Sequence, residues 1–301
     1  MLSLPTIPWP AAFAVGAALV SLSAVLLGRS RVRVALSCLV WLCSLAVPWL
    51  APAADLFPRA LIALLTMLPA LRIIDLVRDP RDWSAAHRIW QFISPFDARE
   101  TSRVAARVDV RAFGAALLQC AVCAAMIVLV QASPDLAPRS LGLAVRLAAG
   151  AAGTYTLVGG FAALTLALYR CAGVDFPPLQ RMPIASRSVQ EFWGERWNRT
   201  INRWLRRNCF APLARRRAPR LGVVAAFTAS ALVHVWIVLA PLGATMALSM
   251  GCYFLVEAAL LLIEAPLRVR RWPRPLQHTW TILAVAGPSP LFIVPMTALL
   301  L

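Results

Sequence analysis

The stretch Leu221–Leu239, read LGVVAAFTASALVHVWIVL, decides the fold class of this chain. It carries no Arg, Lys, Asp or Glu, and its length matches the roughly 20 residues that an α-helix needs to cross a bilayer. Similar runs recur along the 301 residues, of which 60% are hydrophobic. The sequence therefore predicts an all-α, polytopic membrane protein.

Eight membrane spans are predicted, joined by loops of alternating character. They are Trp9–Leu27, Val34–Leu50, Leu56–Ile74, Val110–Gln131, Leu141–Tyr169, Leu221–Leu239, Ala244–Ile263 and His278–Leu300. Loops after the first, third, fifth and seventh spans are rich in Arg, whereas the others are short and nearly neutral. Because basic loops stay in the cytoplasm, we expect both termini on the non-cytoplasmic side, in a membrane expected to be the bacterial inner membrane.

We expect residues 1–301 to form a single integral membrane domain. Residues 1–170 hold five spans and the mixed-charge segment 75–109, whereas residues 171–301 hold a long basic loop and the last three spans. Four residues of segment 75–109 recur at helical spacing, opposite a polar face that includes Gln91: Trp83, Ala86, Trp90 and Ile93. This pattern predicts an amphipathic helix on the membrane surface that ends at Ser94.

The formal charge of +17 results from 30 Arg, with no Lys, against 13 acidic residues. The Arg residues lie in loops between apolar runs, which is typical of membrane topology and argues against a nucleic-acid partner. Residues 170–220 carry 12 Arg against three acidic residues. Since guanidinium groups bind phosphates in a bidentate way, a phosphate-binding role for this loop stays open beside the topological one.

The seven cysteines predict neither a disulfide framework nor a metal site. Five of them lie in apolar runs and are expected to be buried free thiols: Cys38, Cys43, Cys120, Cys123 and Cys252. Cys120 and Cys123 have a CxxC spacing, but no second pair accompanies them. The absence of an internal repeat also argues against a secondary transporter.

The stretch Ser188–Leu205, read SVQEFWGERWNRTINRWL, is the densest cluster of aromatic and polar residues in the chain. Ser188 and Glu191 have the spacing of a capping box, which predicts a helix start. Four apolar residues then predict one face of a single helix: Trp193, Trp197, Ile201 and Trp204. An interfacial anchor explains the Trp and Arg residues, but it does not explain Asn198.

His234 lies inside the sixth predicted span, where an ionisable side chain indicates a functional site. The alternative is a neutral imidazole that hydrogen-bonds a neighbour such as Ser230. Glu257, in the seventh span, is a candidate to orient this imidazole. Glu264 lies near the cytoplasmic end of the same span and is expected to pair with Arg268.

Two segments resemble wax synthase-like proteins of the membrane-bound O-acyltransferase superfamily. Glu191–Asn198, read EFWGERWN, resembles the signature of that family, and Phe227–His234, read FTASALVH, is similar to its histidine helix. Asn198 and His234 match the Asn and His of the superfamily's active site. The resemblance covers about Pro177–Glu264, with Val235 standing where many members have Glu or Asp.

This resemblance implies transfer of an acyl group from acyl-CoA to the hydroxyl of a hydrophobic alcohol, in a membrane-buried tunnel. His234 would be the general base, and Asn198 would stabilise the developing negative charge or position His234. The residues expected to bind substrate are Trp193, Trp197, Arg199, Arg203 and Glu257. Beyond acyl-CoA as a co-substrate, no cofactor and no metal are implied.

Two other functions fit the same sequence. One is a short-chain transferase that moves an acetyl group to a terpenoid, sterol or polyketide hydroxyl. The other is a non-catalytic carrier of lipid or a small molecule, in which His234 is structural. The sequence leaves the acyl length, the acceptor and the oligomeric state open.

Overall fold

The computed structural model describes residues 6–79, 81–94 and 96–300. In these ranges most of the chain is helical, which agrees with the fold class expected for a membrane protein. Contacts divide the chain into two compact units, Met1–Ala98 with Leu232–Leu248, and Arg99–Ala231 with Ser249–Leu301. The single domain expected from the sequence stays a prediction.

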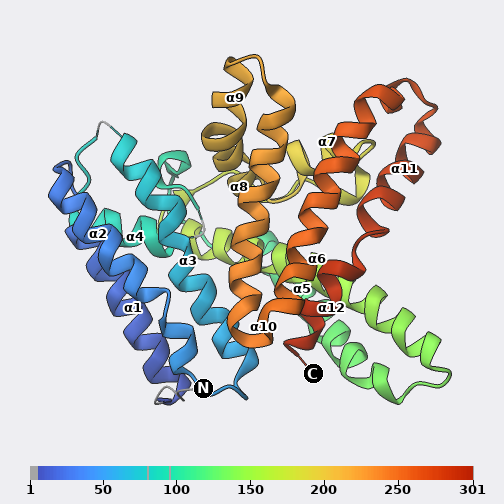
Figure 1. The fold of residues 1–301 in the computed structure, drawn as a ribbon, viewed down its shortest axis with the longest axis horizontal. Coiled ribbons are helices and arrows are strands. Elements are labelled where there is room, and N and C mark those ends of the chain that lie inside the picture. The colour runs from blue at the N-terminus through green and yellow to red at the C-terminus, as the bar shows by residue number, and fades with distance from the viewer. Residues whose placement is uncertain (1–5, 80, 95, 301) are drawn as a thin grey trace. The chain divides into compact units, whose positions relative to one another are not determined.

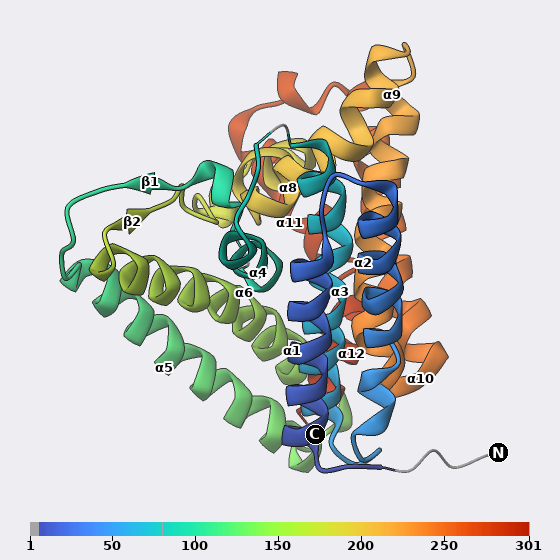
Figure 2. The ribbon, with the colours of Figure 1, turned by 90° about the vertical axis from the view of Figure 1, so that its left-hand side faces the viewer.

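The first unit is built from long antiparallel helices. Its elements are α1 (Trp9–Leu26), α2 (Arg31–Ser44), the 3₁₀-helix η1 (Val47–Leu50), α3 (Leu56–Arg78) and α4 (Ala85–Ile93). Helices α1, α2 and α3 lie side by side, and α4 packs against α1 and α3 (Figures 1 and 2). Side-chain oxygens of Ser30 and Ser84 cap the starts of α2 and α4.

Small polar residues join the helices of this unit inside the apolar layer. Ser23 Oγ of α1 donates to the carbonyl oxygen of Ser37 in α2 at 2.9 Å, and Ser37 Oγ donates to the carbonyl oxygen of Ser23 at 2.8 Å. Both serines are fully buried. Such reciprocal bonds help to hold helices together where lipid removes the hydrophobic driving force for their association.

Helix α4 ends at Ile93, with Ser94 as its C-cap, but one residue of its predicted polar face is not solvent-exposed. Gln91 is buried and its Nε2 donates to Asp97 Oδ1 at 3.2 Å, and Phe92 packs into the core formed with α1. Ile93, expected on the apolar face that meets the membrane, is 47% exposed on the protein surface. The predicted surface anchor is therefore also a packed part of the first unit.

The second unit holds the remaining elements except for α10 (Pro219–Leu267), which is divided between the two units. Before the long basic loop these are η2 (Ala98–Glu100), β1 (Ser102–Arg103), α5 (Val110–Ala132), η3 (Ser133–Asp135), α6 (Arg139–Cys171) and β2 (Val174–Asp175). In the loop they are η4 (Pro183–Ala185), α7 (Val189–Glu191), the π-helix η5 (Phe192–Arg196), α8 (Arg199–Leu205), the π-helix η6 (Arg206–Phe210) and α9 (Ala211–Arg215). The last are η7 (Val269–Arg271), α11 (Arg274–Ala286) and α12 (Pro290–Ala298).

Helices α5 and α6 run alongside each other over much of their length (Figure 2). Gly160 of α6 lies where an added Cβ atom would come within 3.3 Å of Gln119 Cβ in α5, so glycine permits this close approach. Strands β1 and β2 pair antiparallel, with Ser102 opposite Asp175, a small sheet that the all-α prediction did not include. Arg170 binds both Asp109 and Asp175 beside it.

Helix α10 (Pro219–Leu267) covers both the sixth and the seventh predicted spans. Its 49 residues are interrupted at Gly243, whose φ of 77° and ψ of −178° suit glycine alone (Figure 1). Within the described part of the chain, six helices are long and apolar enough to cross a membrane, or seven if α11 and α12, bent by 45°, count as one. The count of eight spans is not confirmed.

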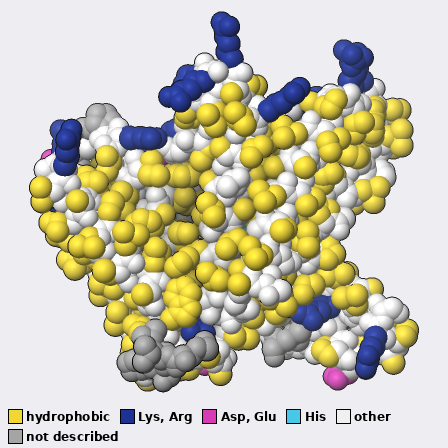
Figure 3. Space-filling model, viewed as in Figure 1, with side chains coloured by type: hydrophobic (Ala, Val, Ile, Leu, Met, Phe, Trp, Pro, Cys, Tyr) yellow, Lys and Arg dark blue, Asp and Glu magenta, His cyan; other side chains and the backbone are white. Residues whose placement is uncertain are grey.

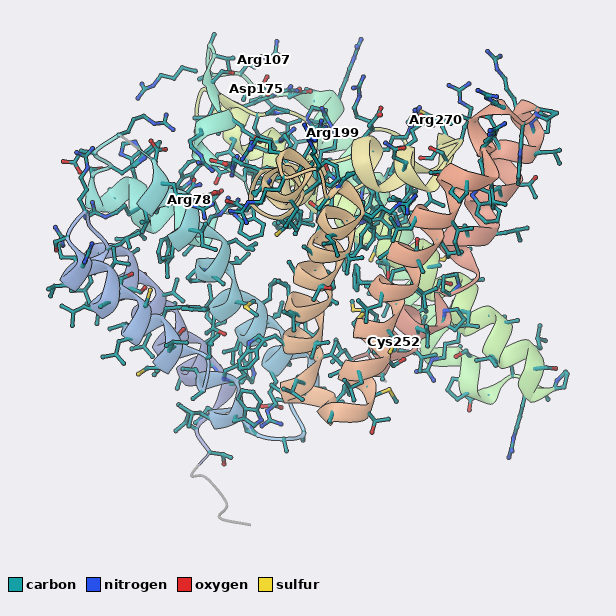
Figure 4. The ribbon with its side chains drawn as sticks, turned by 45° about the horizontal axis from the view of Figure 1, so that its top comes forward. Arg78, Arg107, Asp175, Arg199, Cys252 and Arg270 are labelled. Atoms are coloured by element: carbon teal, nitrogen blue, oxygen red, sulfur yellow. The ribbon has the colours of Figure 1, made fainter. Side chains whose placement is uncertain are left out.

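All seven cysteines are free thiols, but most are not buried by protein. Cys123 is buried and Cys38 is half-buried, whereas Cys43, Cys120 and Cys252 are exposed. The expectation of burial was wrong for these three because an outward side chain of a membrane helix meets lipid instead of protein. Figures 3 and 4 show this setting: hydrophobic side chains cover most of the visible face, and Cys252 lies on α10.

Candidate active site

The motif Glu191–Asn198 does not form one regular helix. The turn α7 passes into the π-helix η5, and α8 begins only after a break at Trp197 and Asn198. The prediction of one continuous helix, with its Trp residues on a single face, was therefore wrong. A π-turn holds one extra residue, which shifts every later side chain around the axis, and such turns occur often at functional sites.

The start of this segment is capped as predicted, with one difference. Ser188 Oγ accepts from the Glu191 amide at 2.9 Å, but the Glu191 carboxylate accepts from the Arg187 amide at 2.8 Å instead of from Ser188. Burial by itself raises the pKa of Glu191, but hydrogen bonds from Arg187 and Arg196 outweigh it and lower that pKa overall. The carboxylate is thus held in its charged form as a cap.

Glu264 of α10 binds the first backbone amides of α7 and so holds the start of this segment in place. Its two carboxylate oxygens accept from the amides of Val189 and Gln190 at 2.7 and 3.0 Å, and Trp280 Nε1 donates to Oε1 at 3.1 Å. An anion at a helix start is favourable because the first amides lack helical partners. The sequence suggested a pairing with Arg268, whereas these contacts make Glu264 a structural anchor.

Replacement of Glu264 by alanine is expected to lower the free energy of unfolding by about 1–3 kcal/mol, because it leaves buried amide donors without an acceptor. Thermal unfolding of the purified protein in detergent measures the change. Glu195→Ala, a change of an exposed glutamate in the same segment, is the control and is expected to leave the midpoint nearly unchanged. Equal midpoints for the two variants would contradict the anchoring role.

Asn198 occupies the break itself. Its backbone is left-handed, with φ 36° and ψ 59°, a conformation that asparagine tolerates better than most residues. Its Oδ1 accepts from the Ile201 amide at 3.4 Å and so caps α8. The described residues give its Nδ2 no hydrogen-bond partner, so the donor side of the amide is available to a ligand.

Trp193 joins the motif to α10. Its indole Nε1 donates to Glu257 Oε2 at 2.8 Å, and its ring lies against Phe227, Tyr253 and Phe254 at centroid distances of 5.8, 6.3 and 6.2 Å. Since Phe227 precedes Gly243 and the other two follow it, Trp193 bridges both parts of α10. Two of the predicted substrate-binding residues, Trp193 and Glu257, are thus brought together.

Two further contacts fix the motif from within. Asn202 Nδ2 donates to the carbonyl oxygen of Trp193 at 2.6 Å, which ties α8 back to the π-helix. Trp197 stacks on Phe192 at 5.6 Å with an interplanar angle of 12°, and it lies 6.2 Å from the ring of Tyr155 in α6. Phe192 also meets the ring of Trp193 edge to face at 5.0 Å, so it joins Trp197 and Trp193 in one aromatic group.

The two arginines predicted to bind substrate have partners within the protein. Arg199 Nη1 donates to the carbonyl oxygen of Pro178 at 3.2 Å (Figure 4), and Arg203 is paired with Glu100. Burial lowers the pKa of Arg199, and the neighbouring charges of Arg203 and Arg181 lower it further. The positive charge here is dense, so an anion would be stabilised beside it.

His234 lies on α10 and is half-buried. Two residues farther on, Trp236 meets Trp49 edge to face at 5.4 Å. His234 belongs to the part of α10 that clusters with the first unit, whereas Asn198 belongs to the second. That the two come together in one site stays a prediction, and so does a contact between Glu257 and His234.

Comparison with known proteins identifies this part of the chain. Residues 176–256 match the family described as the membrane bound O-acyl transferase family. This segment belongs to that family. It contains both Asn198 and His234, and Glu257 follows directly after it.

Curated relatives point to the same family. A probable long-chain-alcohol O-fatty-acyltransferase 2 of Arabidopsis thaliana is 30% identical over 108 residues, which are 33% of this chain and 32% of the plant protein. The plant's probable long-chain-alcohol O-fatty-acyltransferase 3 is 32% identical over 115 residues, with 34% and 33% covered. The chain spans about a third of the length of these relatives.

Sequence reasoning missed several residues that shape the segment 176–256. Tyr253, Phe254 and Phe227 line the indole of Trp193, but in the sequence they look like ordinary residues of apolar spans. The anchoring role of Glu264 could have been predicted, since a carboxylate inside an apolar run must accept hydrogen bonds from other groups. Among the described residues, no three His, Cys, Asp or Glu side chains gather as a metal site requires.

Proposed function

We propose that the chain is a membrane-bound O-acyltransferase that moves an acyl group from acyl-CoA to the hydroxyl of a hydrophobic alcohol. The match of residues 176–256 to an acyl transferase family carries this proposal. The names of the plant relatives, probable long-chain-alcohol O-fatty-acyltransferases, favour a fatty acyl donor and a long-chain acceptor over the acetyl alternative. The apolar helices supply the membrane setting that such substrates need.

In the proposed mechanism, a nitrogen of His234 takes the proton of the alcohol hydroxyl while its oxygen attacks the thioester carbonyl carbon. The carbonyl oxygen becomes negatively charged, and the free Nδ2 donor of Asn198 is suited to stabilise it. The carbon–sulfur bond then breaks, and the CoA thiolate receives the proton from His234. The products are the ester and free CoA, so atoms and charges balance.

The dense positive charge around Arg199 supports entry of CoA from the side of the long loop. Arg181 and Arg203 are close enough to Arg199 for their charges to act on it. Phosphate groups would relieve this repulsion and could accept bidentate hydrogen bonds from guanidinium groups. In this proposal the Arg203 guanidinium binds a CoA phosphate, either in place of Glu100 or together with it.

Release of free CoA by the purified protein tests the function. The protein in detergent is mixed with acyl-CoAs of several chain lengths and with long-chain alcohols, sterols and terpenoid alcohols, and free thiol is measured. Ester formation with a fatty acyl-CoA and a long-chain alcohol is the expected outcome. Turnover with acetyl-CoA alone would favour the short-chain alternative, and no turnover with any pair would favour the carrier.

We also propose the orientation in which the Arg-rich loops face the cytoplasm and the end of this chain lies on the opposite side. A reporter that is active only outside the cytoplasm, fused after Leu301, is expected to be active, because the alternation of basic and neutral loops requires it. The same reporter inserted at Arg216, in the basic loop, should be silent. The reverse pattern would overturn this orientation.

A further inference from the structure

We propose that Glu257 Oε1 binds the hydroxyl of the acceptor alcohol. This inference rests on the proposed function and adds to it the polar end of the acceptor site. Glu257 is fully buried on α10. Its Oε2 accepts from Trp193 Nε1, but its Oε1, which is also buried, has no hydrogen-bond partner among the described residues.

A second glutamate on the same helix, Glu264, has a purely structural role and provides a comparison for Glu257. Glu264 lies two turns farther on and is also buried, but both its oxygens accept hydrogen bonds. Buried polar atoms are nearly always paired, because an unpaired one costs about 1–3 kcal/mol. Oε1 of Glu257, which lacks such a bond, is therefore the atom at which a ligand would bind.

The surroundings of Glu257 select the kind of ligand. The Trp193 indole that binds it lies among Phe227, Tyr253 and Phe254, and the ring of Phe292 lies 5.4 Å from that of Tyr253. The Tyr253 hydroxyl interacts with the Glu257 carboxyl, so the two form a small polar end in an aromatic setting. Such a setting suits a molecule with an apolar body and one polar group. A phosphate is excluded, since among the described residues no cation contacts Glu257 and a carboxylate repels an anion.

A hydroxyl is the polar group that fits best. It both donates and accepts, so it can pair with Oε1 whether the Glu257 carboxyl is charged or protonated. A thioester carbonyl can only accept and would not pair with a carboxylate. Because Trp193 belongs to the same motif as Asn198, an alcohol held here lies next to the segment that supplies the proposed oxyanion donor.

Steady-state kinetics with both substrates varied tests this assignment. Glu257→Leu removes the acceptor atom and is expected to raise KM for the alcohol about 10-fold or more, the value of one buried hydrogen bond, while KM for acyl-CoA stays near that of the wild type. Glu257→Gln keeps the size and a hydrogen-bonding group, so its rise should be smaller. Glu264→Gln, the matched control, should lower the unfolding temperature without changing KM for the alcohol.

The outcomes separate the inference from the proposed function. No CoA release by the wild-type protein would overturn the function. Wild-type turnover with an unchanged alcohol KM in both Glu257 variants would overturn the inference alone and leave Glu257 as an anchor of Trp193. Equal changes in KM for both substrates would do the same. If Glu257→Leu does not fold, the alcohol KM of Glu257→Gln decides.

Discussion

Replacement of His234 by alanine is expected to lower kcat by about 10²–10⁴-fold, down to the background of the assay. An alcohol is a poor nucleophile until a base removes its proton, and a positioned general base contributes about this factor. The half-buried imidazole on α10 is the residue proposed for this role. Free-CoA release under saturating concentrations of both substrates measures the loss.

Two matched variants show whether this loss reflects chemistry or folding. His87→Ala removes an exposed imidazole that contacts Ser84, and it should turn over like the wild type. His234→Gln keeps much of the size and polarity but provides no comparable base, so it should be as inactive as His234→Ala. Normal turnover by either His234 variant, with an unchanged unfolding temperature, would contradict the assignment and return His234 to a structural role.

Hydropathy gave most of the membrane architecture, because the length of an apolar run is fixed by bilayer thickness. Helix α1, predicted as Trp9–Leu27, is found at Trp9–Leu26, and α5, predicted as Val110–Gln131, is found at Val110–Ala132. The break at Gly243 lies between the sixth and seventh predicted spans, Leu221–Leu239 and Ala244–Ile263. Lipid contact and protein contact look alike in composition, however, so the burial of residues such as Cys120 could not be predicted.

The candidate site was predictable in its residue types but not in its geometry. Local spacing found the cap at Ser188, because that bond joins residues three apart. It could not find the π-turn at Phe192–Arg196, which is fixed in place by long-range bonds from Trp193 to Glu257 and from the α7 amides to Glu264. Those contacts join residues more than 60 positions apart, and no local pattern encodes them.

Replacement of Asn198 by aspartate is expected to lower kcat by about 10²–10³-fold while the fold is retained. Aspartate tolerates the left-handed backbone and can cap α8 through the same oxygen, so the local structure keeps its main support. It lacks the Nδ2 donor, and loss of one donor to a developing oxyanion costs about that factor. Kinetics together with thermal unfolding separates the two properties of this side chain.

The comparison with other substitutions decides what Asn198 does. Asn198→Ala loses the cap as well as the donor, so it should be less stable than Asn198→Asp and equally inactive. Asn208→Asp places the same new charge in the same loop, and because its Nδ2 donates to the Trp204 carbonyl, away from the proposed chemistry, kcat should stay close to the wild-type value. If Asn198→Asp also turned over at that rate, the cap would be its whole function, and the oxyanion donor would have to come from another residue.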